Sequence, residues 1–201
     1  MSPAIGRVIC FTTAAAALVA LLAACAGPSA RSGDSLEPAA LGVRPVLAVA
    51  SAIDATEITD DQRAELLALD CAVDGTGVAS PASESILACD DDGEAYLLGP
   101  AELGSAQIAE VSAYSHPGAS DDDWAVLITL DAEGAERLTE LTERLVGHSS
   151  EDPRSRLAMV LDGRVISAPT VMAVITDAQI SLSGGFTEES AKALAERLDA
   201  R

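Results

Sequence analysis

Two histidines, His116 and His148, are the side chains of this sequence best suited to acid–base catalysis at neutral pH. Each lies in a loop-like stretch, and the sequence contains no Gly-x-Ser-x-Gly turn that would supply a nucleophile. It also contains no phosphate-binding loop and no dinucleotide-binding fingerprint. We therefore expect no enzymatic activity, no catalytic residue and no cofactor.

Two acidic runs are candidates for metal binding, because calcium prefers oxygen ligands such as carboxylates. The run Asp90–Asp92 precedes Gly93. A 12-residue EF-hand calcium loop with that glycine in sixth place would start at Ala88 and end at Gly99. Such a loop requires an acidic residue at both of these positions. The second run, Asp121–Asp123, is typical of a solvated loop. The sequence therefore predicts no metal site.

Cys25 follows the apolar stretch Val8–Ala24, which Arg7 precedes and which is shorter and smaller than a usual spanning helix. Its last residues, Leu22–Cys25, resemble the lipobox of bacterial lipoproteins, in which a lipid is attached to the cysteine before cleavage. We therefore predict a lipoprotein signal peptide at residues 1–24, lipid attachment at Cys25 and a location on the extracytoplasmic face of the cell membrane. An ordinary secretory signal and a retained membrane anchor are the alternatives. Both also place the folded part outside the cytoplasm.

Cys71 and Cys89 remain once the signal peptide removes Cys10 and the lipid occupies Cys25. In an oxidising compartment a disulfide is the default state of such a pair. The cross-link would stabilise the fold by about 3 kcal/mol through the entropy of the unfolded chain. Two free buried thiols are the alternative. A metal site would need more ligands than these two thiols supply.

The charge balance is strongly acidic, with 32 Asp and Glu against 12 Lys and Arg and a formal net charge of −20. Binding to a phosphate backbone requires a basic surface, so we expect no nucleic acid partner. Anionic lipid headgroups would also repel the chain. A lipid on Cys25 would nevertheless hold it at the membrane, because acyl chains contribute more affinity than the surface charge removes.

The chain divides by composition into several parts. Residues 25–42 are small, polar and interrupted by Pro and Gly, which predicts a flexible tether. A small N-terminal subdomain at 43–95 would carry the disulfide and a helix that begins with the capping box of Thr59 and Gln62. The main domain would follow at 96–201.

The main domain shows the clearest periodicity. In order, its sequence predicts a strand at Tyr96–Leu98, a strand at Trp124–Leu130, a helix capped by Asp131, a hairpin around Asp162 and Gly163, extended segments at Val171–Ile175 and Gln179–Ser183, and a helix capped by Thr187. Two amphipathic helices and four or five half-buried strands best bury their apolar faces when both helices pack on one face of a mainly antiparallel sheet. The predicted fold class is therefore a two-layer α+β domain.

Several stretches resemble the P1 head of the translocase subunit SecD. They are YLLGP at 96–100, the strand and helix at 124–147, LAMVLDGRVISAP at 157–169 and GGFTEESAKALAERL at 184–198. VRPVL at 43–47 extends the resemblance to residues 43–200. VMAVITD at 171–177 departs from the family pattern.

The resemblance implies a domain that contacts secreted polypeptides, and Sec translocase subunits, at the outer face of the membrane. SecD also has transmembrane helices that couple export to the proton gradient. This sequence shows none after Cys25, so we expect a stand-alone lipoprotein without that coupling.

Addition of an extended chain to a sheet edge or an apolar groove would suit such binding, because backbone hydrogen bonds demand no particular sequence. The candidate polypeptide-binding residues are Val171, Met172, Val174 and Ile175. A fully buried strand is the alternative interpretation of that segment. The alternative function is that of an envelope adaptor or small-ligand-binding lipoprotein that kept the fold but not the export role.

Overall fold

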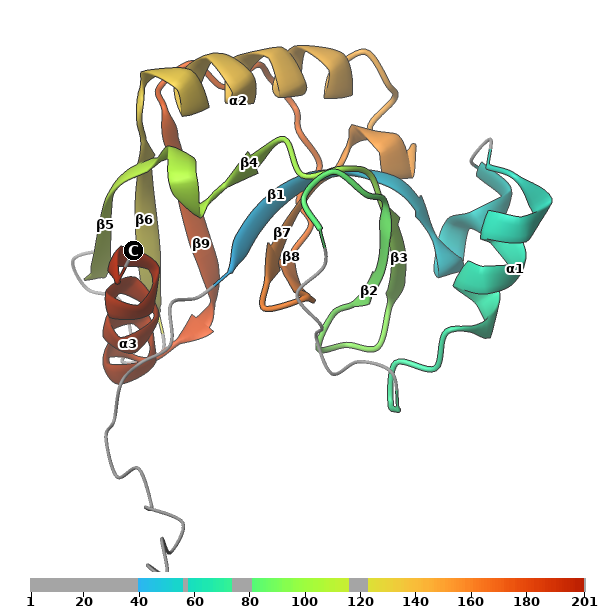
Figure 1. Ribbon diagram of the computed structural model, residues 1–201, viewed down its shortest axis with the longest axis horizontal. Coiled ribbons are helices and arrows are strands. Elements are labelled where there is room, and N and C mark those ends of the chain that lie inside the picture. Colours follow the sequence, from blue (N-terminus) through green and yellow to red (C-terminus); the bar gives the residue numbers. More distant parts are fainter. Residues whose placement is uncertain (1–39, 56–57, 74–80, 116–122, 201) are drawn as a thin grey trace, which may run out of the picture. The chain divides into compact units, whose positions relative to one another are not determined.

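The computed structural model describes residues 40–55, 58–73, 81–115 and 123–200. The predicted signal peptide at 1–24 and most of the predicted tether, with Cys25, lie outside the described residues. Within the described part, the strands form two antiparallel sheets accompanied by three α-helices (Figure 1). The predicted α+β class and the antiparallel pairing are confirmed. The strands are divided over two sheets, whereas the sequence pattern predicts one.

The first sheet is six-stranded and curled (Figure 1). Its strands in spatial order are β2 (Ile86–Cys89), β3 (Ala95–Leu98), β1 (Leu41–Val49), β7 (Leu157–Leu161) and β8 (Arg164–Ser167), and β4 (Leu103–Gly104) pairs with β1. β1 is hydrogen-bonded to β3 on one side and to β7 on the other. Strands from both sides of the predicted boundary between 43–95 and 96–201 therefore share this sheet.

The hairpin of β7 and β8 turns at Asp162 and Gly163, as the sequence predicted. These two residues have φ angles of 50° and 82°. Positive φ at both central positions is the conformation of the two-residue turns that suit the right-handed twist of a hairpin. A local signal therefore determined both the place and the type of this turn.

The second sheet is three-stranded, in the order β5 (Ile108–Ser115), β6 (Trp124–Leu130) and β9 (Gln179–Phe186). The predicted alternation in β6 is confirmed, because Val126, Ile128 and Leu130 are all buried in one cluster. Successive side chains of a strand point to opposite faces, so these three share the face that packs against the helices.

The helices are α1 (Asp60–Ala68), α2 (Ala132–Leu145) and α3 (Glu188–Asp199), and the short 3₁₀ segments are η1 (Ala50–Ala55), η2 (Ser105–Gln107) and η3 (Pro153–Ser155). The predicted N-caps are confirmed for all three α-helices. Thr59, Asp131 and Thr187 each accept a hydrogen bond from a backbone N–H in the first turn of the helix that follows. These bonds satisfy N–H groups that a helix start leaves without partners.

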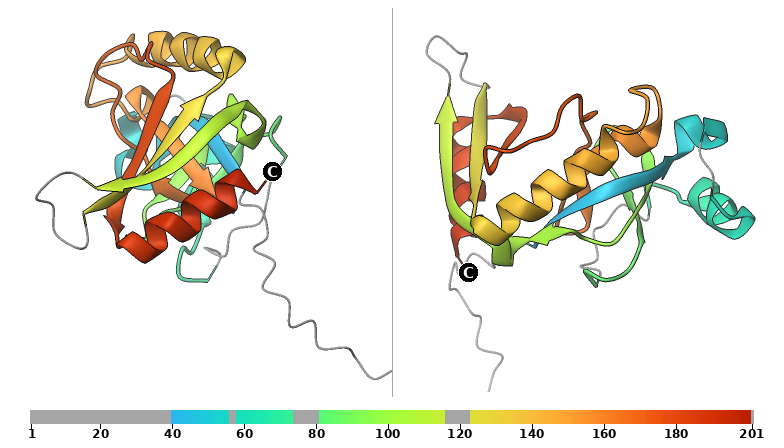
Figure 2. Two further views of the ribbon diagram at one scale, coloured as in Figure 1. Left: turned by 90° about the vertical axis from the view of Figure 1, so that its left-hand side faces the viewer. Right: turned by 90° about the horizontal axis from the view of Figure 1, so that it is seen from above.

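One large core joins α2, α3 and both sheets. It contains Leu138 and Leu141 of α2, Leu198 of α3, Ile128 of β6 and Val43 of β1. Figure 2 shows α3 lying along the second sheet, while α2 runs from the end of β6 over β1. Both amphipathic helices therefore bury their apolar stripes in the same core.

Candidate functional site

The segment 168–178 links β8 to β9 and contains the predicted polypeptide-binding residues. No strand forms in it before β9 begins. The Val171 N–H donates to the Ser155 carbonyl oxygen at 2.8 Å, and the Ile175 N–H donates to the Thr142 hydroxyl at 3.1 Å. The extended segment expected at Val171–Ile175 therefore does not pair as a strand of a sheet, because these backbone groups bond to η3 and to a helix hydroxyl.

Two threonines of α2, Thr139 and Thr142, fasten this segment to the helix. The Thr139 hydroxyl shares its proton between the Ile175 carbonyl oxygen at 3.0 Å and the Ala135 carbonyl oxygen of its own helix at 2.9 Å. Thr142 is fully buried, and its hydroxyl also donates to the Leu138 carbonyl oxygen at 2.8 Å. Neither residue is among the candidates that the sequence pattern indicates. A hydroxyl inside the apolar stripe of a helix was the available signal, because buried polar groups need hydrogen-bond partners.

The four predicted residues divide into two anchors and two exposed side chains. Val171 is buried and Ile175 is half-buried. Met172 is 76% exposed and Val174 is 38% exposed. The alternative of a fully buried strand is therefore also wrong. The segment presents two apolar side chains to solvent between backbone positions that hydrogen bonds hold in place.

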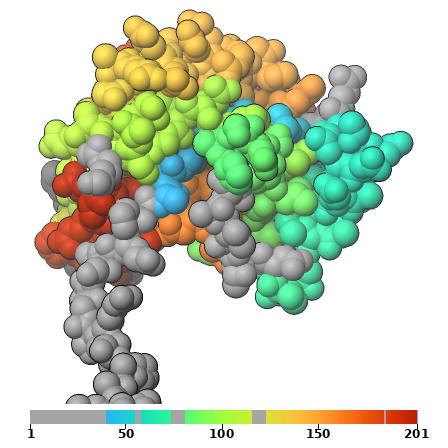
Figure 3. All heavy atoms as spheres, viewed as in Figure 1, coloured from blue at the N-terminus to red at the C-terminus, as the bar shows by residue number. Residues whose placement is uncertain are grey.

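A shallow hollow of about 330 Å³ lies on α2 beside this segment. It is lined by Ala135, Glu136, Thr139, Glu140 and Glu143. Thr139 belongs both to the hollow and to the contact with Ile175, so the carboxylates and the anchored segment are neighbours. Figure 3 shows α2 on the molecular surface. This region therefore combines exposed apolar side chains with negative charge.

A second cavity, of about 430 Å³, is bordered by β1, β4 and the loop before β2. Arg44 lines it and is almost fully buried, and burial lowers the pKa of its guanidinium. The Arg44 Nη1 donates to the carbonyl oxygens of Glu84 and Gly99 at 2.7 and 2.9 Å, and Nη2 donates to that of Pro81 at 3.1 Å. Because three carbonyls already engage this cation, Arg44 serves to hold the loop against β1.

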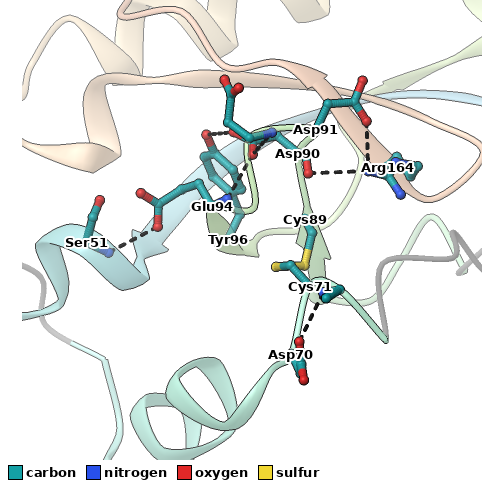
Figure 4. The surroundings of a disulfide bond; sticks show 11 residues. Ser51, Asp70, Cys71, Cys89, Asp90, Asp91, Glu94, Tyr96 and Arg164 are labelled. Atoms are coloured by element: carbon teal, nitrogen blue, oxygen red, sulfur yellow. Dashed lines mark hydrogen bonds and ion pairs between the residues drawn. A yellow bond between two sulfur atoms is a disulfide. The ribbon is translucent and has the colours of Figure 1, made fainter.

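Cys71 and Cys89 are joined by the predicted disulfide, with their Cα atoms 5.6 Å apart (Figure 4). The bond connects the residues that follow α1 to the end of β2. Cys89 is 2% exposed. The cross-link therefore lies at the margin of a small core that α1 and β3 share, and the alternative of two free thiols does not hold.

Asp90 organises the turn between β2 and β3 (Figure 4). Its Oδ1 accepts hydrogen bonds from the backbone N–H groups of Asp92 and Glu94, and its Oδ2 accepts one from the Tyr96 hydroxyl at 2.8 Å. Burial, together with this bond to Asp90, raises the pKa of the Tyr96 phenol. The Asp90 carboxylate thus acts as a turn acceptor. Among the described residues, no group of three or more His, Cys, Asp or Glu side chains is placed to hold a metal ion.

Two residues of chemical interest lie outside the described part of the chain: Cys25, the predicted lipid-attachment site, and His116. The other histidine, His148, follows α2 and has its Nδ1 3.8 Å from Oδ2 of Asp152. Within residues 40–55, 58–73, 81–115 and 123–200, no helix is both long and apolar enough to cross a membrane.

The family model described as "SecDF, P1 head subdomain" matches residues 83–200. The chain is 30% identical to the protein translocase subunit SecD of Streptomyces coelicolor over 152 residues, which are 69% of this chain and 26% of the relative. It is 48% identical to SecD of Desulfurispirillum indicum over 66 residues, which are 33% of this chain and 12% of that relative. The chain therefore spans about a quarter or less of the length of these relatives.

A structure of SecDF, a membrane component that enhances protein export, matches with a TM-score of 0.49 and 26% sequence identity. The match covers 81% of this chain and 62% of that one.

Proposed function

The chain belongs to the SecDF P1 head family, and from that premise we propose that it binds polypeptides during protein export. The similar proteins are translocase subunits several times longer than the matched region. The proposal therefore concerns polypeptide binding by the head alone and includes no catalytic step and no cofactor. Its partners are secreted polypeptides and subunits of the Sec translocase, and nucleic acid is not among them.

The exposure of Met172 and Val174 on an anchored segment is the observation that carries this proposal. A chain that has not yet folded exposes apolar side chains, and burying one such side chain contributes about 1.5–3 kcal/mol. Hydrogen bonds to Ser155, Thr139 and Thr142 hold the segment before a partner arrives. Binding then costs less conformational entropy than it would with a free loop.

Attachment to the membrane by a lipid on Cys25 is the second part of the proposal. The signal-like stretch and the lipobox-like tetrapeptide before this cysteine support it. Replacement Cys25→Ala should release the chain from the membrane fraction, and mass spectrometry of the wild-type amino terminus should detect a lipidated Cys25. An unmodified cysteine with an intact leader before it would contradict this part.

Site-directed crosslinking in cells tests the binding function. A photoreactive amino acid at Met172 of the full lipoprotein should form adducts with secreted polypeptides or translocase subunits. Leu67 of α1 is a matched control, because it is also apolar and is 58% exposed. Equal adducts at both positions, or none at Met172, would count against polypeptide binding at this segment. The alternative, a small-ligand role for the 430 Å³ cavity, lacks a supporting observation, because Arg44 is already engaged.

A further inference from the structure

β5 forms an outer edge of the second sheet. Among the described strands it pairs with β6 alone, and α3 packs against the pair. Figures 1 and 2 show β5 at the margin of this sheet, and Figure 3 shows the yellow-green residues that include β5 on the molecular surface. The strand has eight residues, Ile108–Ser115, which is long enough to pair with a further strand.

The backbone of β5 is available along its centre. No backbone hydrogen bond from a described segment outside the sheet reaches residues 109–113. In an antiparallel ladder, the N–H and C=O groups of every second residue point away from the paired strand. Alternate residues of 109–113 therefore direct donors and acceptors to the side where no described strand lies.

The edge lacks the features that usually block pairing. Natural edge strands are protected by Lys, Pro, bulges or covering elements. β5 contains no Lys, Arg or Pro, and its single register irregularity lies at its start, between Ile108 and Glu110. Ala109, Glu110 and Ser112 are exposed, and Glu110 is the strand's one charge. Pairing therefore meets little steric or electrostatic opposition.

The other sheet edges are less accessible. β2 and β8 end the first sheet, but its curl brings them near each other. The Arg164 guanidinium on β8 reaches the Asp91 carboxylate beyond β2 at 2.7 Å. β9 lies against β8. Among the described strands, β5 is therefore the edge best placed to accept another strand.

We propose that the outer edge of β5 binds an extended segment of a secreted polypeptide as an additional antiparallel or parallel strand. This inference rests on the proposed function and names its mode of recognition. Outward-facing N–H and C=O groups match the backbone of any extended polypeptide, so binding tolerates many sequences. That tolerance suits a protein that meets many exported chains.

A second copy of this chain is a poorer occupant of the same edge. Each copy carries a formal net charge of −20, so two copies repel each other at close range. An unfolded polypeptide with a positive net charge is attracted by the same field. The edge is therefore better suited to a foreign, basic chain than to self-pairing.

Hydrogen–deuterium exchange on the full chain is the direct test. The probe is reduced and alkylated pancreatic trypsin inhibitor, an unfolded basic polypeptide, and fluorescence anisotropy reports its binding. With bound probe, the outward-facing amides among residues 109–113 should exchange at least about tenfold more slowly, because they gain hydrogen-bond partners. Binding with protection only at 171–178 would overturn the β5 edge but leave the proposed function intact. Failure to bind the probe would overturn both, and light scattering that shows dimers would favour self-pairing instead.

Two proline variants, Ser112→Pro and Ala113→Pro, form a matched pair. One of these neighbours bonds to β6 and the other faces outward, so only one replacement should preserve the thermal midpoint. That stable variant should bind the probe about tenfold more weakly, because it lacks an outward N–H and carries a bulky ring at the edge. Wild-type affinity in the stable variant would overturn the inference. If neither variant folds, the exchange result on the unaltered chain decides.

Discussion

Gly134 lies in the first turn of α2, where the neighbouring chain leaves no space for a side chain. An added Cβ would lie 2.9 Å from the Gln107 Cβ and 3.0 Å from the Leu130 Cβ. Alanine normally favours a helix over glycine by about 1 kcal/mol. At this position the steric conflict should outweigh that gain.

We expect Gly134→Ala to reduce the free energy of unfolding by about 1–3 kcal/mol, as overpacking does elsewhere. Urea denaturation would measure the change. Glu136→Ala, at an exposed position on the same helix, should alter stability by no more than about 0.5 kcal/mol. A stabilised Gly134→Ala variant would show that helix propensity dominates over packing here.

Asp152 gives a prediction about pH. The Arg154 guanidinium donates to both of its carboxylate oxygens, through Nε at 3.1 and 3.2 Å and Nη2 at 2.8 Å. These hydrogen bonds from Arg154 lower the pKa of Asp152, although burial opposes them. Because the folded-state pKa lies below the unfolded one, the carboxylate stabilises the fold above the unfolded pKa. That stability is lost as the pH falls through the folded pKa.

Asp152→Asn should therefore destabilise the protein by about 1 kcal/mol at neutral pH, since the neutral amide loses the ion pair with Arg154 and its charge-assisted hydrogen bonds. The difference from the wild type should stay constant down to about pH 4 and shrink below it. Urea denaturation of both proteins at a series of pH values would measure this. A difference that does not depend on pH would mean that the charge of Asp152 contributes nothing.

The disulfide compensates for the weak packing of α1. Leu66 is the one buried residue of this helix, so burial alone supports it poorly. The Cys71–Cys89 bond connects positions 18 apart in the sequence. It restricts the unfolded chain and holds the end of the helical segment against β2.

A double variant with Cys71→Ser and Cys89→Ser should lose about 3 kcal/mol of unfolding free energy. Chemical denaturation with and without reductant measures the effect. Reductant should destabilise the wild type by a similar amount and leave the double variant unchanged. Equal stabilities of oxidised wild type and double variant would show that the bond constrains little.

Local signals in the sequence predicted most individual elements correctly. A helix cap needs only a side-chain oxygen within three residues of the N–H groups that it serves, as at Thr59, Asp131 and Thr187. The hairpin at Asp162 and Gly163 depends on two adjacent φ angles. Such features involve neighbouring residues, and the amino-acid types show them directly.

Features that depend on distant residues were harder to predict. The division into two sheets arises from pairings such as Val43 with Met159, which no local pattern reveals. An apolar run like 171–175 is compatible with a buried or an exposed segment. The distant residues that pack against it determine which of the two forms. The hydroxyls of Thr139 and Thr142, some thirty residues earlier in the chain, hold this segment against α2. The sequence therefore singled out a candidate segment, but its geometry could not be predicted.

Charge acts on the molecule as a whole. The chain has 32 acidic and 12 basic side chains, so even complete pairing leaves most carboxylates without a partner of opposite charge. The pairs that form are weak contributors, because exposed ion pairs are worth about 0–1 kcal/mol each. Repulsion among the remaining carboxylates therefore outweighs attraction in the compact state.

Sodium chloride should consequently stabilise the folded protein. Raising it from about 10 mM to about 300 mM shortens the screening length several-fold and should raise the thermal midpoint by about 2–5 °C. Calorimetry at constant pH would measure the shift. A variant with Glu136→Gln, Glu140→Gln and Glu143→Gln should respond less, because it removes three neighbouring negative charges from α2. A midpoint that falls with salt would mean that attractive ion pairs, and not self-repulsion, dominate the electrostatics. In that case charge would not oppose the pairing of two copies along β5.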